Sequence, residues 1–188
     1  MFILAAFETD AERLRSTVTD SLIKEIGKGD MDAFHTLYEA AHTSVYGFAL
    51  SILKNTHDAQ DVLQDTFIAV HENAVGYLPQ GKPMAWILSI AKNFALGKLR
   101  KNAKEPLAQE FIIENERAID EIASLEQREA IKAMLAILDD EEREIVMLHA
   151  AAGFKNREIA ELLGLKLSTV LSKYHRAIKK LEKSVEEE

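Results

Sequence analysis

Basic and hydroxyl side chains recur at helical spacing near the C-terminus, a pattern suited to binding nucleic acid. They share one stripe of residues 167–183: Thr169, Ser172, Lys173, Arg176, Lys180 and Lys183. Lys and Arg neutralise phosphates, and Ser and Thr hydroxyls hydrogen-bond either phosphates or base edges. The solvated face of an ordinary amphipathic helical hairpin has the same pattern, because a basic stripe is only the electrostatic footprint of a nucleic-acid binder.

Two predicted helices and a tight turn position this stripe. Asn156 is a good N-cap for the first helix, in which Ile159, Leu162 and Leu163 share an apolar face. Gly164 stands where a left-handed C-cap would end that helix. The second helix carries an apolar face of its own: Leu167, Val170, Tyr174, Ala177, Ile178 and Leu181. A Gly-containing turn before a basic helix predicts a helix-turn-helix whose second helix can enter a major groove.

The net charge of −8 is divided unevenly along the chain. Residues 1–81 carry −7 and residues 105–144 carry −9. By contrast, residues 82–104 hold 6 basic residues and no acid, and residues 145–188 carry +2. Two cationic islands in an acidic body suit a protein that contacts nucleic acid at two places and something else elsewhere.

Composition argues against several other kinds of protein. The chain has no cysteine, which excludes disulfides, thiolate metal sites and cysteine nucleophiles. Its 6 histidines show no metal-ligand spacing with acids, and neither a phosphate-cradling glycine loop nor a nucleophile motif is present. We therefore expect no metal, no cofactor and no enzymatic activity.

The apolar segments are too short for a membrane protein. None approaches the roughly 20 residues that span a bilayer. The apolar start of the chain lacks a basic region and meets Glu8 and Asp10 at once, which is unlike a signal peptide. We expect a cytoplasmic protein without membrane insertion.

Helical periodicity covers nearly the whole chain, and no convincing period-two stretch is present. We expect an all-α protein of two small helical domains joined by a linker, the C-terminal one with the helix-turn-helix. The expected parts are an N-terminal extension (1–19), a first domain (20–101), an acidic linker (102–124) and a second domain (125–188). Helix caps are expected at Asp30 or Asp32 and at the turn over residues 55–58. The Gly- and Pro-rich stretch 76–83 predicts an ordered loop before the next helix.

Four blocks of sequence resemble parts of bacterial sigma factors. Residues 58–67 (DAQDVLQDTF), 86–93 (WILSIAKN) and 99–101 (LRK) resemble their second domain. Residues 138–146 (LDDEEREIV), followed by the helix-turn-helix, resemble their fourth domain. The blocks occur in the expected order and at the expected separation, so the chain looks like the extracytoplasmic-function group of sigma factors.

The resemblance implies a dissociable specificity subunit that binds core RNA polymerase, directs it to specific promoters and helps to open the DNA. The helix over residues 58–67 would dock on a coiled coil of the largest catalytic subunit. Its polar side chains are acceptors suited to Arg-rich partner helices: Asp58, Gln60, Asp61, Gln64 and Asp65. A plain solvated face is the other interpretation of these residues.

The resemblance assigns opening of the minus-ten promoter element to the loop over residues 76–83 and the helix after it. Aromatic platforms, amides and cations are needed there to hold an unpaired base and the separated strand. The candidates are Tyr77, Gln80, Lys82, Trp86, Lys92, Asn93, Lys98, Arg100 and Lys101. Trp86 is also readily interpreted as a core residue, because its neighbours are apolar.

The resemblance assigns the minus-thirty-five element to the helix-turn-helix. The candidates are Asn156, Arg157, Lys166, Ser168, Thr169, Ser172, Lys173 and Arg176. Lys166 stands where the family has a small N-cap, so Ser168 is expected to cap a later helix start. Leu171 stands where the family commonly has a basic residue, which favours an apolar contact with a thymine methyl group or a partner.

The implied partners are core RNA polymerase, double-stranded and locally melted promoter DNA and an anti-sigma factor, and the free chain is expected to be a monomer. The acidic linker would thread near the polymerase active-site and RNA-exit path, although a solvated tether fits it equally. The rival hypothesis is a conventional helix-turn-helix regulator that binds palindromic DNA as a homodimer. The acid-free helix beside a Gly/Pro loop favours the sigma factor, because a sensor domain would need neither.

Overall fold

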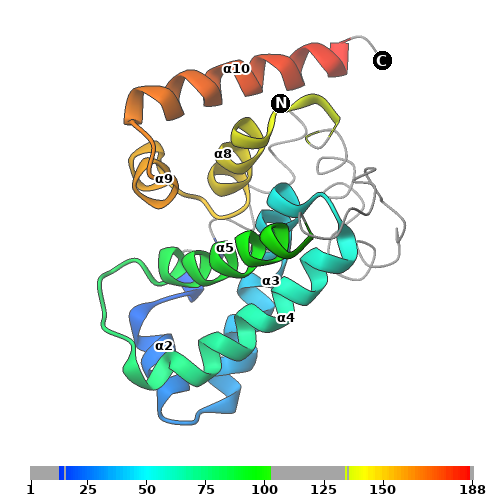
Figure 1. The fold of residues 1–188 in the computed structure, drawn as a ribbon. Coiled ribbons are helices and arrows are strands. Elements are labelled where there is room, and N and C mark those ends of the chain that lie inside the picture. Colours follow the sequence, from blue (N-terminus) through cyan, green and yellow to red (C-terminus); the bar gives the residue numbers. More distant parts are fainter. Residues whose placement is uncertain (1–12, 15, 103–133, 135, 187–188) are drawn as a thin grey trace.

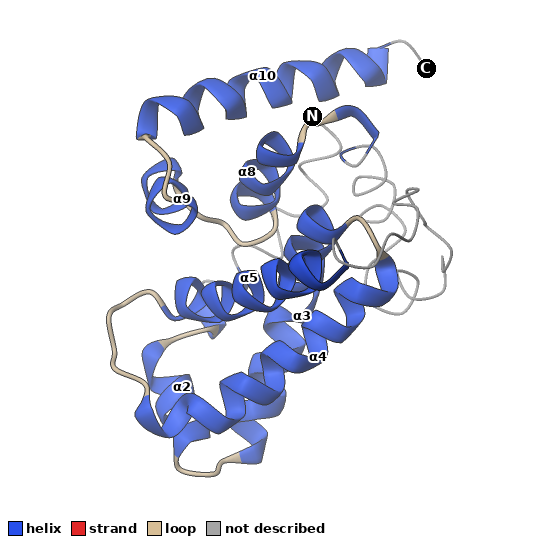
Figure 2. Ribbon diagram, viewed as in Figure 1, coloured by secondary structure: helices blue, strands red, loops and turns tan. Residues whose placement is uncertain are grey.

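The computed structural model describes residues 13–14, 16–102, 134 and 136–186, and every regular element in them is a helix (Figures 1 and 2). The elements are α2 (Asp20–Gly27), α3 (Met31–Leu53), α4 (Thr56–Asn73), the 3-10 helix η1 (Ala74–Gly76), α5 (Pro83–Asn102), α8 (Asp140–Ala150), α9 (Asn156–Leu163) and α10 (Leu167–Glu186). The expected all-α class is confirmed. None of these helices combines the length and the apolar character that crossing a membrane requires. The predicted linker beyond Asn102 and the predicted start of the second domain lie outside the described residues.

Short polar side chains begin two of the helices, as the sequence predicted. Asp30 Oδ1 accepts hydrogen bonds from the backbone N–H groups of Asp32 and Ala33 at 2.9 and 3.0 Å, so Asp30 is the cap. Asn55 Oδ1 accepts one from the N–H of Asp58 at 2.9 Å. Each cap satisfies donors that have no partner within the helix.

The helix-turn-helix differs from its predicted boundaries at two points. Lys155, not Asn156, occupies the N-cap position of α9, and its backbone N–H donates to Glu158 Oε2 at 2.8 Å. Ser168 lies in the first turn of α10, so the prediction that it caps a later start is wrong. Gly164 ends α9 with a φ of 69°, the predicted left-handed cap.

Helices α2 to α5 form the first helical unit, in which α3, α4 and α5 pack against one another (Figure 1). Its core includes the fully buried side chains of Tyr46, Phe48, Leu50, Ile87 and Leu88. Burying a side chain of this size contributes about 1.5–3 kcal/mol relative to leaving it in water. This core fixes the relative positions of α4, α5 and the loop between them.

Helices α8, α9 and α10 form the second helical unit, which packs on the first because α8 lies on α3 (Figure 1). The Ser44 hydroxyl donates a hydrogen bond to the carbonyl of Ala151 at 2.6 Å, and both residues are buried. Beside it, the methyl end of Met147 occupies the space over Gly47, only 2.3 Å from where a β-carbon would stand. The two units therefore share one buried contact.

Charged groups border this contact. Lys54 Nζ lies 2.6 Å from Asp140 Oδ1. Glu144, on α8, is half-buried. Burial raises the pKa of the Glu144 carboxyl; Lys92 and Arg143 oppose this rise, and Asp140 and Glu141 add to it. Glu144 therefore binds a proton more readily in the folded chain than in the unfolded chain.

This raised pKa predicts that Glu144 makes the chain less stable as pH rises. Between the usual value of 4.5 and the raised pKa, the folded state holds more protons, so the free energy of unfolding falls as pH increases. We expect Glu144→Gln to unfold at a higher temperature than the natural chain near neutral pH, and the two to converge toward pH 4.5. Thermal unfolding across a pH series checks this, with Glu72→Gln as an exposed control. A lower Tm for Glu144→Gln near neutral pH would contradict it.

Candidate nucleic-acid interface

The carboxylate of Asp20 on α2 accepts hydrogen bonds from two residues of the loop that precedes α5. Asp20 Oδ1 accepts a hydrogen bond from the Tyr77 hydroxyl at 2.5 Å, and Oδ2 accepts one from the Gly81 N–H at 2.8 Å. Gly81 has a φ of 71°, in the left-handed region that favours glycine. Between these two anchors, Leu78 and Gln80 are exposed. The loop is therefore an ordered surface, as the sequence predicted.

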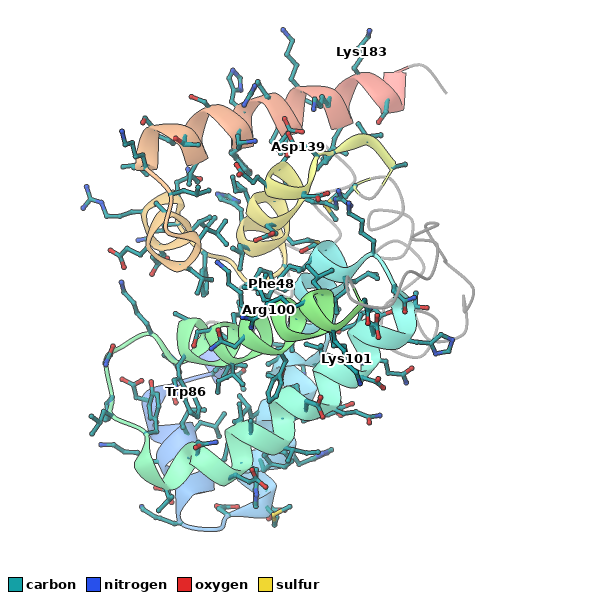
Figure 3. All side chains as sticks on the ribbon, in the orientation of Figure 1. Phe48, Trp86, Arg100, Lys101, Asp139 and Lys183 are labelled. Carbon is teal, nitrogen blue, oxygen red and sulfur yellow. The ribbon has the colours of Figure 1, made fainter. Side chains whose placement is uncertain are left out.

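An aromatic ring of this loop lies against one of α5. The Tyr77 and Trp86 ring centroids are 4.7 Å apart with the planes inclined by 51°. Burial, followed by the hydrogen bond to Asp20, raises the pKa of Tyr77, so its hydroxyl remains a donor at neutral pH. Trp86 is half-buried, and Figure 3 shows it close to the start of α5. It packs against the core, as one interpretation expected, and also borders a cleft, whereas its contact with DNA remains a prediction.

That cleft has a volume of about 660 Å³ and lies between the loop and α9. The predicted residues Tyr77, Gln80, Lys82 and Trp86 line one side. The opposite side is lined by three residues of α9: Glu158, Glu161 and Leu162. The structure therefore brings four of the predicted minus-ten residues together, in a place that α9 also borders.

The other predicted cations of α5 have different surroundings. Lys92 is half-buried and donates to the carbonyl of Leu162 at 3.3 Å. Arg100 and Lys101, labelled in Figure 3, are exposed near the end of α5, as is Asn93 nearer its middle. Lys82 and Arg100 are about 27 Å apart along the chain at the helical rise, so they cannot contact the same nucleotide.

Lys98 joins α5 to the acidic face of α4. Its Nζ lies 3.0 Å from Asp58 Oδ1 and 2.6 Å from Asp61 Oδ2. The second oxygen of Asp58 accepts a hydrogen bond from Asn102 at 2.9 Å. Although burial lowers the pKa of Lys98, the bonds to Asp61 and Asp58 raise it overall. Lys98 is therefore a charged link between the two helices.

The acidic face of α4 is consequently divided. Asp58 and Asp61 are bonded to α5, whereas Gln64 and Asp65 are exposed one turn further on, and Gln60 is half-buried. Beside the exposed pair lies Ile68, whose exposed fraction of 57% is large for an apolar side chain within a helix. The sequence analysis did not select Ile68, although its spacing from Gln64 and Asp65 places it on their face.

On α10, the buried positions Val170, Ala177 and Leu181 fix which face is exposed. The exposed stripe contains Ser168, Leu171, Ser172, His175, Arg176 and Lys179. His175 and Lys179 were not among the predicted residues. Helical spacing from Ser172 and Arg176 is the signal that would have found them.

Two basic residues of α10 lie toward α8 instead. Lys173 Nζ is 3.4 Å from Asp139 Oδ2 and 3.2 Å from Glu141 Oε2, and Lys180 Nζ is 2.6 Å from the buried Glu142. Asp139, labelled in Figure 3, is the N-cap of α8. A DNA contact by Lys173 therefore remains a prediction, and its ion pairs would compete with that contact.

The remaining predicted residues border α9 and the turn. Arg157 and Lys166 are exposed, and Thr169 is half-buried. Asn156 is half-buried, and its side-chain oxygen has no hydrogen-bond partner among the described residues. Across all the residues that the structure describes, no group of three or more His, Asp and Glu side chains is arranged to hold a metal ion.

Comparison with known proteins places both units in one family. The model for Sigma-70 region 2 matches residues 37–105, and the model for Sigma-70 region 4 matches residues 128–181. The extracytoplasmic-function sigma factor SigK of Mycobacterium sp. (strain KMS) is 26% identical over 174 residues, 89% of this chain and 90% of that protein. SigW of Bacillus subtilis (strain 168), of the same class, is 25% identical over 176 residues, 87% of this chain and 94% of that protein. The chain belongs to the extracytoplasmic-function sigma factors.

Two of the solved structures similar to this chain have the same fold, and one of them is a sigma factor. CnrH in complex with the cytosolic domain of CnrY is 24% identical with a TM-score of 0.62, over 91% of this chain and 99% of that chain. RpoE of Bartonella quintana in complex with the anti-sigma factor NepR is 22% identical with a TM-score of 0.64, over 81% of this chain and 96% of that chain. The conventional homodimeric regulator is not favoured, because it would not account for the region 2 match.

The position of Asp20 predicts a role in this sigma factor that the sequence analysis missed. We expect Asp20→Ala to free both ends of the loop and to lower open-complex formation about five- to thirtyfold, the effect of losing about 1–2 kcal/mol of loop order. Permanganate reactivity of unpaired thymines measures the opening. Asp32→Ala removes an exposed acid from the first turn of α3 and serves as the control.

Tyr77→Phe removes only one of the two bonds to Asp20, so we expect it to have a smaller effect on opening. Asp20→Asn keeps one acceptor oxygen and should also be intermediate. Normal opening by Asp20→Ala with normal polymerase binding would contradict this role.

Proposed function

We propose that this sigma factor uses three separate surfaces to start transcription at specific promoters. Helix α4 binds core RNA polymerase, the loop with α5 binds and opens the minus-ten element, and α10 binds the minus-thirty-five element. The observation that carries this proposal is the loop over residues 76–83, which two hydrogen bonds to Asp20 hold beside α5, a helix without acidic residues. The exposed basic helix α10 lies in the other helical unit, so the two cationic surfaces are separate.

The polymerase surface is centred on the exposed part of α4. Gln64 and Asp65 offer acceptors for Arg side chains of the polymerase. Ile68, on the same face of α4, offers an apolar contact to the same partner. Asp58 and Asp61 act indirectly in this proposal, because their bonds to Lys98 fix α4 against α5.

The minus-ten surface supplies the groups that a melted strand requires. Trp86 and Tyr77 provide aromatic faces, exposed Gln80 provides an amide, and Lys82 and Lys92 provide cations. Arg100 and Lys101 extend the positive charge along α5 to a neighbouring part of the DNA backbone.

The minus-thirty-five surface is the exposed stripe of α10. Arg176 and Lys179 supply phosphate or guanine contacts, Ser172 supplies a hydroxyl, and Leu171 supplies an apolar contact for a thymine methyl group. Arg157 at the start of α9 would add a phosphate contact beside the groove.

The proposed partners follow from these surfaces. We propose an anti-sigma factor as the regulator, because surfaces kept for polymerase and DNA must be covered when initiation is unwanted. RpoE of Bartonella quintana was solved with such a factor. A co-purified protein that blocks polymerase binding is the expected finding, and failure of every co-purified protein to do so would count against it. The site of action would be the cytoplasm, with the free chain as a monomer and without a cofactor.

In-vitro transcription tests the function. Purified core polymerase, genomic DNA of the source organism and this chain should yield discrete transcript starts that are absent without the chain. We expect Asp65→Ala/Ile68→Ala to weaken core binding about tenfold or more, the size of effect expected at the centre of an interface. Transcription should fall with it at limiting protein concentration.

Glu39→Ala, an exposed acid on α3, is the matched control and should leave both quantities unchanged. The absence of specific starts with the natural chain would contradict the proposed function. Normal core affinity of the double variant would contradict the placement of the polymerase surface.

A further inference from the structure

The first turns of α10 present the same pair of side chains twice. Leu167 is followed by Ser168, and Leu171 is followed by Ser172, so a Leu-Ser pair recurs after four positions. All four residues are exposed, and the exposed fractions of Leu167 and Leu171 are 37% and 47%. Because residues four positions apart are neighbours on the surface of a helix, the second pair repeats the first one turn further on.

The core of the second unit does not account for the two leucines. The positions at which α10 is buried are Val170, Ala177 and Leu181, and α10 packs against α8 and α9. The leucines lie outside this buried stripe, among polar residues. Apolar side chains on the outer face of an amphipathic helix break its pattern, and such departures from local rules are expected at functional sites.

The cations of α10 come after the Leu-Ser pairs. Residues 167–172 include no charged residue, whereas the exposed Arg176 and Lys179 follow later in the helix. Lys173, the first cation of α10, is paired with acids at the start of α8. In a helix-turn-helix, the N-terminal residues of the second helix contact base edges, whereas cations bind the phosphates of any sequence. The part of α10 suited to reading bases therefore offers apolar and hydroxyl groups.

A leucine beside a serine is complementary to thymine in the major groove. Thymine presents a C5 methyl group and the acceptor O4 there, and the other three DNA bases carry no such methyl group. The leucine can cover the methyl group, and the serine hydroxyl can donate a hydrogen bond to O4. Four residues of a helix rise about 6 Å, and two base-pair steps rise about 7 Å. Two Leu-Ser pairs one turn apart therefore match two thymines separated by one base pair.

We propose that the two Leu-Ser pairs of α10 determine the sequence specificity of this sigma factor at the minus-thirty-five element, by reading the methyl groups of two thymines separated by one base pair. Leu167 covers one methyl group and Leu171 covers the other. This inference names the bases that α10 reads, and it rests on the proposed function of α10. The promoters that this chain selects should accordingly share two A·T pairs at this spacing.

Uracil in place of thymine removes only the methyl group, so it tests the proposal without any change in the protein. The probes are promoter duplexes mapped from the transcript starts, with uracil at one or both positions, bound to core polymerase that carries the natural chain. We expect affinity to fall roughly fourfold for one methyl group and roughly fifteenfold for both, the effect of exposing one or two buried carbons.

Uracil at a thymine between the two promoter elements is the control and should have no effect. Equal affinities for the thymine and uracil duplexes would overturn the proposal, as would mapped promoters without the two A·T pairs. Transcript starts report separately on the proposed function: their absence would contradict that function, whereas specific starts at promoters insensitive to uracil would contradict only the reading of methyl groups.

Shortening one leucine at a time tests which side chain reads which methyl group. We expect Leu171→Ala to stop distinguishing thymine from uracil at one position, and Leu167→Ala to stop doing so at the other. Met31→Ala shortens an exposed apolar side chain on α3 and should leave this discrimination intact. Undiminished discrimination in both leucine variants would overturn the proposal. A loss of affinity for core polymerase alone would also overturn it, because the leucines would then belong to a protein interface.

Discussion

The packing of α8 on α3 is the contact on which the rest of the arrangement depends. It requires small groups on α3, because Ser44 and Gly47 let the backbone after α8 and the side chain of Met147 approach closely. Because only a few residues separate α8, α9 and α10, the packing of α8 on α3 also fixes the positions of α9 and α10 relative to the loop over residues 76–83. One buried contact thus determines which cations of the first unit remain available to DNA.

Ion pairs within this chain of net charge −8 limit how strongly its predicted DNA-binding lysines can bind phosphates. Lys98 is bound by acids of α4, Lys173 by acids of α8 and Lys82 by an acid of α9. A phosphate that reaches one of these lysines replaces a carboxylate rather than water. The gain from such an exchange is small and depends on salt, so selectivity must come from polymerase and from the shape of the loop.

Sequence reasoning succeeded for some features whose physical cause is local and failed for others, because the N-cap of α9 is Lys155 rather than Asn156 and Ser168 lies within α10. A cap at Asp30 or Asp32, a cap in the turn over residues 55–58 and a left-handed Gly164 were predicted, and the structure has Asp30, Asn55 and Gly164 in these roles. The contacts that shape the site join distant residues: Asp20 to Gly81 spans 61 positions, and Lys82 to Glu161 spans 79. No periodic pattern encodes such pairs, because they arise only when the helices pack.

The distance between the two units is the measurement that tests this account most directly. Spin labels on cysteines introduced at Glu39 and Glu182, both exposed, would report it without interference from natural cysteines. The account predicts one distance population in the free chain that matches the packing of α8 on α3. It predicts a population longer by tens of ångströms when core polymerase and promoter DNA are bound, because the promoter elements lie about 85 Å apart. An unchanged distance in the transcription-competent complex would contradict the account.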